Sequence, residues 1–391
     1  MNQKLTEQSV QDFINENLHG DISKLALLKS PFSDISMKEL AVQIEGKRKA
    51  KEKFPFCFHT KKIIYPSPIA MEQCSSELTA DYKASLYPKK RIIDLTGGFG
   101  VDSWAFSKQF KEVFYCEKDK ETAAVATYNF SLFGAENISV YQGDGIEFLR
   151  QNGRRFDLIY IDPSRRDSHN RKMHAFSDCT PDVVANLDLF FEHGDRILIK
   201  ASPMFDIEKA LHELKFVVEI HICAVKNEVR EVLYLLERKQ CDSERVFTIN
   251  FLNQNLQQKF SFFKRELAEN GAIYSLPLRY LYEPNHAVMK SGAFNLLCSR
   301  YDVMKLHKNS HLYTSERFVG SFPGRCFKMV TVLPYKKHEK LINVNVTTRN
   351  FPDTPEQVLK KMKVKEGGDD YLFCTTLLDN KPAVLLCEKI I

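Results

Sequence analysis

The stretch Arg91-Ile92-Ile93-Asp94-Leu95-Thr96-Gly97-Gly98-Phe99-Gly100-Val101-Asp102 decides the fold. A short apolar run is followed by three glycines and then by a segment with helical spacing, 103–110. Glycine lets the backbone turn sharply and approach a ligand closely. The helix that follows such a loop offers unpaired N–H groups and the positive end of its dipole. This strand–loop–helix unit predicts a binding site for a nucleotide, or for a nucleoside that carries a carboxylate.

Short apolar runs alternate with amphipathic segments on both sides of this loop. The alternation predicts an α/β fold with a parallel sheet covered by helices on both faces. The expected strands are 91–95, 113–116, 138–141, 156–161 and 196–200, and the expected helices include 103–110 and 120–133. Two further strand-like runs, 216–224 and 231–237, are separated by only six residues. That gap is too short for a helical crossover, so this last pair is expected to be antiparallel.

The glycine loop alone matches a dinucleotide fingerprint only in part. Gly98 and Gly100 take the first two glycine places, but Ser103 stands at the third, where glycine permits tight packing of helix on strand. Glu117 follows at the distance expected of an acid that holds a ribose hydroxyl pair. Dinucleotide and S-adenosylmethionine sites share that acid, so it does not separate the two ligands.

Acidic residues also stand at the ends of the neighbouring strands. Asp94 closes the first strand, Asp144 lies in Gly143-Asp144-Gly145 after the third, and Asp162 opens Asp162-Pro163-Ser164-Arg165 after the fourth. Open α/β sheets bind ligands outside the carboxyl ends of their strands. Asp94 there can attract a positively charged methionine moiety, and Asp144 can accept from an adenine amino group.

With these residues, the segment 91–238 resembles a class I S-adenosylmethionine-dependent methyltransferase. The resemblance implies S-adenosyl-L-methionine as cofactor, Glu117 as the ribose acid, Asp144 as the adenine-side acid, and Asp162 to Arg165 as the catalytic motif. Thr96 stands where many members have glycine, a variant that resembles a bacterial small-subunit ribosomal RNA guanine methyltransferase. The expected cofactor-binding residues are Gln73, Ser76, Asp94, Thr96, Gly97, Gly98, Phe99, Gly100, Asp102, Glu117, Lys118, Asp144, Gly145 and Asp162.

The catalytic motif departs from the amino-methylating pattern. Asp162 and Pro163 suit a site where a carboxylate and a rigid backbone orient an amine. The aromatic residue that stacks on the target base in those families is absent, because Ser164 and Arg165 take the last two places. Arginine can still stack on a base or pair with phosphate. A uracil-5 methyltransferase would need a cysteine nucleophile, and Cys179 is the nearest downstream cysteine, outside any Pro-Cys motif.

Two neighbouring segments leave alternatives open. Gln73 and Ser76 precede a helix, where they either close over the methionine end of the cofactor or simply cap that helix. The basic stretch 165–174, directly beyond the catalytic motif, either meets a nucleic-acid backbone or is an exposed loop paired with nearby acids. The charge run 47–53 either covers a solvated helix face or contacts phosphate.

The flanking regions predict further domains. We expect an N-terminal helical region over 1–87, the methyltransferase domain over 88–240, a linker with a small ferredoxin-like module over 241–317, and a small α+β domain over 318–391. Arg349-Asn350-Phe351-Pro352, the capped helix starting at Thr354-Pro355 and Gly367-Gly368 carry a resemblance to the THUMP-like domain of a bacterial methyltransferase family. THUMP domains are associated with RNA modification, which makes structured RNA the expected partner.

Composition narrows the class of protein. The net charge of +6 is compatible with a nucleic-acid partner without demanding one. The ten cysteines form no Cys-x-x-Cys pair and the histidines no metal pattern, so we expect reduced thiols, no metal and a cytoplasmic protein without membrane spans. The prediction is an S-adenosylmethionine-dependent methyltransferase for a base, with a slight preference for an exocyclic amine, in rRNA or tRNA. The alternatives are an RNA-binding protein that has lost catalysis, a methyltransferase for protein or a small molecule, and a dinucleotide oxidoreductase.

Overall fold

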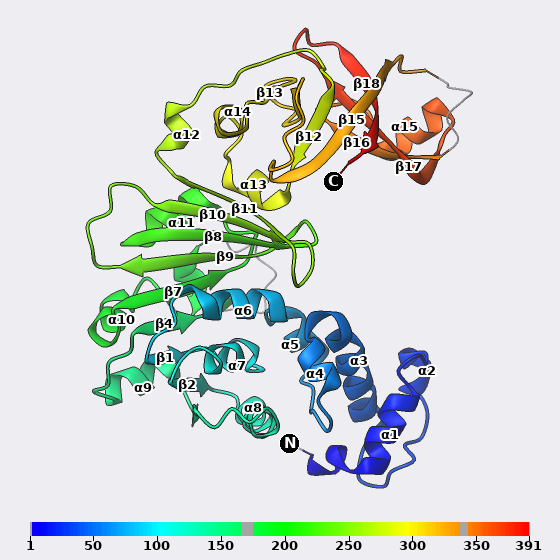
Figure 1. Cartoon of the computed structure of the whole chain (residues 1–391). Helices are drawn as coiled ribbons and strands as arrows, with labels where there is room; N and C mark the ends of the chain where they lie inside the picture. The colour runs from blue at the N-terminus through cyan, green and yellow to red at the C-terminus, as the bar shows by residue number, and fades with distance from the viewer. Residues whose placement is uncertain (1, 166–174, 337–342, 391) are drawn as a thin grey trace. The chain divides into compact units, whose positions relative to one another are not determined.

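A computed structural model describes residues 2–165, 175–336 and 343–390 of the chain (Figure 1). The chain divides into two compact units, of which the first comprises 1–218 and 233–240 and the second 219–232 and 241–391. The boundary therefore passes through a pair of strands, and each unit is described by itself below.

A nine-stranded sheet has the strand order β11-β10-β8-β9-β7-β4-β1-β2-β3. Its parallel part is built by the apolar runs expected from the sequence, and β1 pairs with β2 on one side and β4 on the other. These strands are β1 (Arg91–Asp94), β2 (Glu112–Glu117), β3 (Ile138–Gln142), β4 (Leu158–Ile161) and β7 (Arg196–Ala201). The carboxyl ends of β1 to β4 consequently lie at one edge of the sheet.

After its parallel strands, the sheet continues with the antiparallel pair that the short gap predicts. A further hairpin, which the sequence analysis does not predict, then extends the sheet beyond this pair. β8 (Val217–Val225) and β9 (Glu228–Glu237) are neighbours joined by Lys226 and Asn227, which have positive φ angles of 50° and 64°. Such a two-residue turn matches the twist of antiparallel strands. β10 (Arg245–Phe251) then pairs parallel with β8, and β11 (Gln257–Phe263) pairs antiparallel with β10. Residues 245–263, expected as part of a linker and a ferredoxin-like module, thus extend the sheet.

Helices cover both faces of the parallel strands. Successive side chains of β2 point to opposite faces, so Tyr115 packs on Phe130 of α8 while Phe114 packs on Phe148 of α9. The helices of this region are α6 (Glu77–Leu86), α7 (Val101–Ser107), α8 (Lys120–Leu132), α9 (Gly145–Gln151), α10 (Leu187–His193) and α11 (Ile207–Glu213), with η2 (Phe176–Asp178) and the short strands β5 (Ser164–Arg165) and β6 (Cys179–Thr180). The carboxyl ends of the parallel strands therefore lie between the two layers of helices.

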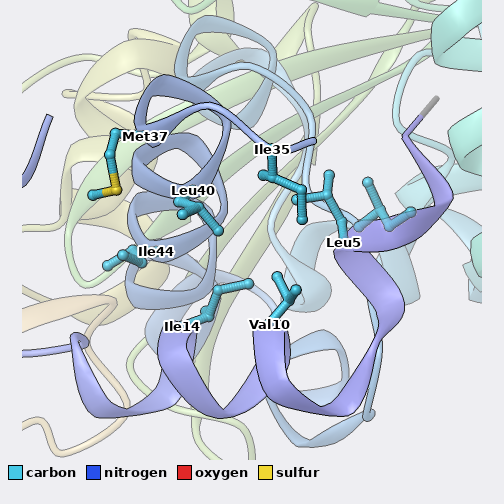
Figure 2. Close-up of a cluster of buried hydrophobic side chains, with 8 residues drawn as sticks. Leu5, Val10, Ile14, Ile35, Met37, Leu40 and Ile44 are labelled. Atoms are coloured by element: carbon cyan, nitrogen blue, oxygen red, sulfur yellow. The ribbon is translucent and has the colours of Figure 1, made fainter. Parts of the chain in front are cut away.

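The N-terminal region is helical, as expected, and has its own small core. Figure 2 shows apolar side chains of η1, α1 and α3 converging there, among them Leu5, Val10, Ile14 and Leu40. The elements are η1 (Gln3–Thr6), α1 (Gln8–Glu16), α2 (Ile22–Leu25), α3 (Met37–Lys53), α4 (Pro55–His59) and α5 (Pro68–Gln73).

The charge run 47–53 ends α3 and makes contacts within the protein. Arg48 donates to the carbonyl of Asn17 at 2.9 Å and also to those of Leu18 and Gly20, and Lys53 donates to those of Met71 and Glu72 at 2.8 Å. Part of the run therefore fastens the loop after α1 and the helix α5 to α3, so the run is not simply a solvated helix face.

The second unit contains a seven-stranded sheet of order β13-β14-β12-β15-β18-β17-β16. Its strands are β12 (Tyr280–Pro284), β13 (Met304–Lys305), β14 (Tyr313–Ser315), β15 (Gly324–Leu333), β16 (Asn343–Arg349), β17 (Lys365–Thr376) and β18 (Pro382–Lys389), and its helices are α12 (Glu266–Glu269), α13 (His286–Ser291), α14 (Leu296–Tyr301) and α15 (Pro355–Met362). α15 begins with the predicted capping box, in which Thr354 and Gln357 each bond the other's backbone N–H.

Candidate active site

The glycine loop is shaped by the rings beneath it. A Cβ atom on Gly97 would lie 2.1 Å from the Tyr115 ring, and one on Gly100 would lie 2.5 Å from the Phe130 ring. Gly98 has a φ of +53°, and a Cβ there would meet only the Thr96 carbonyl at 3.9 Å. The Tyr115 hydroxyl donates to the Gly98 carbonyl at 2.6 Å. The loop is thus pressed onto packed rings at Gly97 and Gly100 and open at Gly98.

Asp94, at the end of β1, is buried and held by its own loop. Its Oδ1 accepts from the Thr96 N–H at 3.0 Å, and its Oδ2 accepts from the Ser103 hydroxyl at 2.6 Å. Burial disfavours the charged form and raises the pKa of Asp94 to about 7, although these hydrogen bonds oppose the shift. Asp94 can therefore change its charge near neutral pH when a cation arrives.

Asp102, in the first turn of α7, is buried against a lysine. Lys83 of α6 is fully buried, and its Nζ lies 3.2 Å from Oδ1 of Asp102. The hydroxyls of Ser75 and Tyr160 both donate to Oδ2 at 2.8 Å. Lys83, with Lys200, and these hydroxyl groups outweigh desolvation and keep the pKa of Asp102 below its usual value. The helix α6 is thereby tied to α7 and β4 through one carboxylate.

Asp162 follows β4 and pairs with a second lysine. Lys200 Nζ, near the end of β7, lies 2.5 Å from Oδ2 of Asp162, and about a third of the Asp162 side chain (34%) is exposed. Burial raises the pKa of Asp162, with Lys200 acting in the opposite direction. The Asp162 N–H donates to the Thr96 hydroxyl at 2.7 Å, so Thr96 joins the first and fourth strand ends.

Lys83, Asp94, Asp102, Asp162 and Lys200 form what we call the buried charge cluster. Asp102 influences the pKa values of both other carboxyl groups, and Lys200 influences those of Asp102 and Asp162. With all groups ionised the cluster carries three negative and two positive charges. One positive ligand group would balance it.

A second pair of acids lies at the ends of β2 and β3, and both are more exposed than Asp94 and Asp102. Glu117 accepts from the Gly98 N–H through Oε2 and from the Asp119 N–H through Oε1, both at 2.8 Å. Asp144 caps α9 by accepting from the Ile146 N–H at 2.7 Å and pairs with Lys118 at 2.6 Å. Gly145 is required by packing, because a Cβ there would lie 2.7 Å from the Leu95 carbonyl oxygen.

The other residues predicted for the site have mixed surroundings in the structure. Ser76 caps α6, the structural alternative named above, and Gln73 ends α5 with an exposed side chain. Phe99 is buried against Phe54. Pro163 follows Asp162 directly, and the next residue, Ser164, is exposed in β5.

The described part of the segment predicted to be catalytic ends at Arg165. The backbone of Arg165 belongs to β5 opposite Cys179, whereas its side chain and the basic residues 166–174 lie outside the described part. Cys179 itself is buried, 2% exposed, and its thiol lies 3.7 Å from the Ala175 carbonyl.

Five residues of the site were missed by the sequence analysis: Ser75, Lys83, Ser103, Tyr160 and Lys200. Two of them carry a detectable signal. Lys200 directly follows the apolar run 197–199, which places it at the same sheet edge as the acids, and Lys83 shares a helix face with the small residues Thr79, Ala80 and Ala84. A lysine on a face of small residues has room to be buried.

Metal-ligand groups and membrane-spanning helices are both absent among the described residues. No group of three or more His, Cys, Asp or Glu residues among them is placed to hold a metal ion. No helix among them is long and apolar enough to cross a bilayer.

Family comparisons match three segments of the chain. They are Conserved hypothetical protein 95 over residues 77–177, a ferredoxin-like domain over 280–323 and a THUMP domain-like family over 324–389. Among curated proteins, the chain is 29% identical over 77 residues to an uncharacterised RNA methyltransferase of Mycoplasma mobile, covering 20% of this chain and 21% of that protein. It is 24% identical over 157 residues to a Sulfurisphaera tokodaii protein assigned as a cobalt-precorrin-6B C(15)-methyltransferase (decarboxylating), covering 39% of this chain and 75% of that protein. The chain thus spans about a fifth of the length of the first relative and three quarters of the second.

A solved structure matches nearly the whole chain. The crystal structure of a Porphyromonas gingivalis W83 protein assigned as a methyltransferase is 29% identical, covers 98% of both chains and superposes with a TM-score of 0.87. The resemblance drawn from the glycine loop and the C-terminal motifs is therefore confirmed. The chain has a methyltransferase-like α/β fold, with segments that match a ferredoxin-like domain and a THUMP-like domain towards its C-terminus.

Proposed function

We propose that this protein is an S-adenosylmethionine-dependent methyltransferase that modifies a base, with an exocyclic amine slightly preferred, in rRNA or tRNA. One observation carries the proposal: Asp94, Glu117, Asp144 and Asp162 stand at the ends of four neighbouring parallel strands, around a glycine loop that is open at Gly98. Ligands of open α/β sheets bind at such strand ends.

The charges at this edge fit the cofactor. The buried charge cluster has one carboxylate more than it has lysines, and Asp94 within it titrates near pH 7. A sulfonium or ammonium group beside Asp94 would favour its ionised form. Glu117, which already touches the loop at Gly98, would hold the ribose hydroxyls, and Asp144 would accept from the adenine amino group.

Asp162 is the proposed catalytic residue. S-adenosylmethionine, when bound, supplies an electrophilic methyl group, and the protein has to align a nucleophile with it. Lys200 fixes one carboxylate oxygen of Asp162, which leaves the other oxygen to accept an N–H of the target amine and orient its lone pair. Pro163 stiffens the backbone at this point, and Ser164 and Arg165 complete the motif.

RNA is the proposed substrate class because of the domains attached to the sheet. The THUMP-like match and the relative named as an RNA methyltransferase both support it. The expected location of such a protein is the cytoplasm. A small-molecule acceptor is the second candidate, since the other curated relative is named for methylation of a corrin precursor and the motif lacks a stacking aromatic residue.

The test combines cofactor binding with methyl transfer. We expect S-adenosylmethionine and S-adenosylhomocysteine to bind in calorimetry, and tritium from labelled cofactor to enter total cellular RNA in a form that ribonuclease releases. Label that survives ribonuclease but is released by protease would establish a protein substrate. Cofactor binding without methyl transfer to RNA, protein or a small-molecule extract would favour the alternative of an RNA-binding protein that has lost catalysis. Stabilisation by a nicotinamide dinucleotide alone would contradict the cofactor assignment.

A further inference from the structure

The hairpin β10–β11 presents planar side chains on one face. In the register of the sheet, Arg245 lies opposite Phe263 on one side and Glu219 on the other, and Phe247 lies opposite Ser261 and His221. Directly opposed residues of neighbouring strands share a face of the sheet. β11 is also the first strand of the sheet order, with no further strand beyond it among the described residues.

These side chains stack in an uninterrupted series. His221 lies flat on Phe247, with ring centroids 4.7 Å apart and an angle of 8° between the planes. The Arg245 guanidinium lies 4.8 Å from the Phe247 centroid and 5.9 Å from that of Phe263, and the Arg265 guanidinium lies 5.3 Å from Phe263. We call His221, Phe247, Arg245, Phe263 and Arg265 the stacking ladder.

The outer end of the stacking ladder is exposed and cationic. Phe263 is 42% exposed, and Arg245 and Arg265 are exposed as well. Residues 245–265 contain four Lys or Arg and no Asp or Glu. Among the described residues, no ion pair within 4 Å involves Arg245 or Arg265, although Glu266, which is paired with Arg300, also interacts electrostatically with Arg265. Two arginines and an aromatic ring are therefore available to a partner.

We propose that the stacking ladder is a docking surface for an unpaired stretch of RNA. Bases of any identity stack on aromatic and guanidinium planes, and arginine also pairs with phosphate. The hairpin carries four cationic and no acidic side chains over 245–265, with Glu244 and Glu266 just outside it and Glu219 opposite Arg245. Its cations suit a polyanion, and the series of planar groups that ends in the exposed Phe263 ring suits stacked bases. The inference rests on the proposed function only for the choice of RNA as substrate class, and it concerns a surface that the cofactor does not occupy.

The experiment measures RNA binding by the full-length protein, without methyl transfer. The probe is a fluorescein-labelled single-stranded RNA of mixed sequence and about 12 nucleotides, within the usual footprint of such surfaces. Anisotropy titrations at several salt concentrations give both the affinity and its salt dependence. Thermal melting of each variant shows that it is folded.

Charge and stacking are separated by two variants. We expect Arg245→Ala/Arg265→Ala to weaken binding and to flatten the plot of log affinity against log salt by about 1.4, or roughly 0.7 for each phosphate contact. We expect Phe263→Ala to weaken binding roughly tenfold with an unchanged slope, and Phe263→Trp to retain affinity. Arg155→Ala is the matched control, because Arg155 is exposed but paired with Asp195.

Three results would overturn the inference. They are unchanged RNA affinity in both folded ladder variants, an equal loss in the Arg155 control, and a dimeric protein that becomes monomeric on Phe263→Ala while keeping its RNA affinity. The last result would show that the stacking ladder is an interface between two copies of the protein. Cofactor binding and methyl transfer are measured separately from RNA binding. If the wild-type protein transfers no methyl group but the ladder variants still weaken RNA binding, the proposed function is contradicted and the docking surface is retained.

Discussion

The two ends of the candidate site use the same kinds of residue in opposite surroundings. At the inner end, Lys83 is fully buried against Asp102, and the Lys200 side chain is only 9% exposed beside Asp162. At the outer end, Lys118 is 57% exposed beside Asp144. Water screens an exposed pair, while a buried charge depends on its partner for stability. The inner end should therefore govern folding and chemistry, and the outer end only affinity.

The largest expected effect comes from breaking the inner pair. Lys83→Met leaves the Asp102 carboxylate buried without its cation, so we expect the free energy of unfolding to fall by about 3–5 kcal/mol. Urea denaturation monitored by circular dichroism measures it. Lys118→Met is the matched control at the outer end, and its expected cost is below about 1 kcal/mol. If Lys83→Met and Lys118→Met lowered the free energy of unfolding equally, the inner and outer ends would not differ in their contribution to stability.

The next effect concerns Asp162, whose side chain is 34% exposed at the inner end. Asp162→Asn keeps the volume but loses the charge paired with Lys200, and we expect methyl transfer to fall by about 100-fold or more. The cofactor dissociation constant should change by less than about threefold, since the proposed role concerns the acceptor. Single-turnover transfer and calorimetry separate the two quantities. A parallel loss in both would assign Asp162 to cofactor binding instead.

The raised pKa of Asp94 predicts how the inner end responds to pH. An unfolded aspartate titrates near about 4, whereas burial raises the pKa of Asp94 in the folded protein to about 7. The folded state binds this proton more tightly, so stability falls as pH rises between these values, by at most about 1.4 kcal/mol per unit. We expect the stability of the wild type relative to Asp94→Asn to decline over that window and to level off above it. A difference that grows with pH would show that Asp94 is ionised throughout.

The smallest expected effect lies at the outer end. Glu117→Gln keeps an oxygen for the Gly98 N–H but weakens the proposed contact with the ribose, so we expect cofactor affinity to fall about tenfold, or about 1.4 kcal/mol. The melting temperature without cofactor should stay unchanged. Glu121→Gln, on the exposed first turn of α8, is the control. A melting temperature lowered as far as that of Lys83→Met would show that the outer end also stabilises the fold.

The contrast between the ends also explains what the sequence could predict. Strand ends and glycines form local patterns, so Asp94, Glu117, Asp144 and Asp162 could be placed along the sheet edge from the sequence alone. Lys83 and Lys200 have weaker sequence signals and were missed, because a lysine is normally exposed and its burial depends on which distant carboxylate it contacts. Ser75 was missed for a similar reason: the local pattern favours Ser76, whose hydroxyl caps a helix, while Ser75 reaches Asp102, 27 positions along the chain. The β10–β11 hairpin was missed because its pairing with β8 is long-range.

The Thr96 hydroxyl has a consequence for how this site can vary among relatives. It accepts from the Asp162 N–H, while the Thr96 N–H holds Asp94, so one residue fixes the spacing of two loops that are 66 positions apart. A glycine at this position would leave the Asp162 N–H to find another acceptor. Exchange at position 96 should therefore be accompanied by change in the segment that begins at Asp162, and serine should be the substitution tolerated without such change. The two loops are expected to be inherited as a pair.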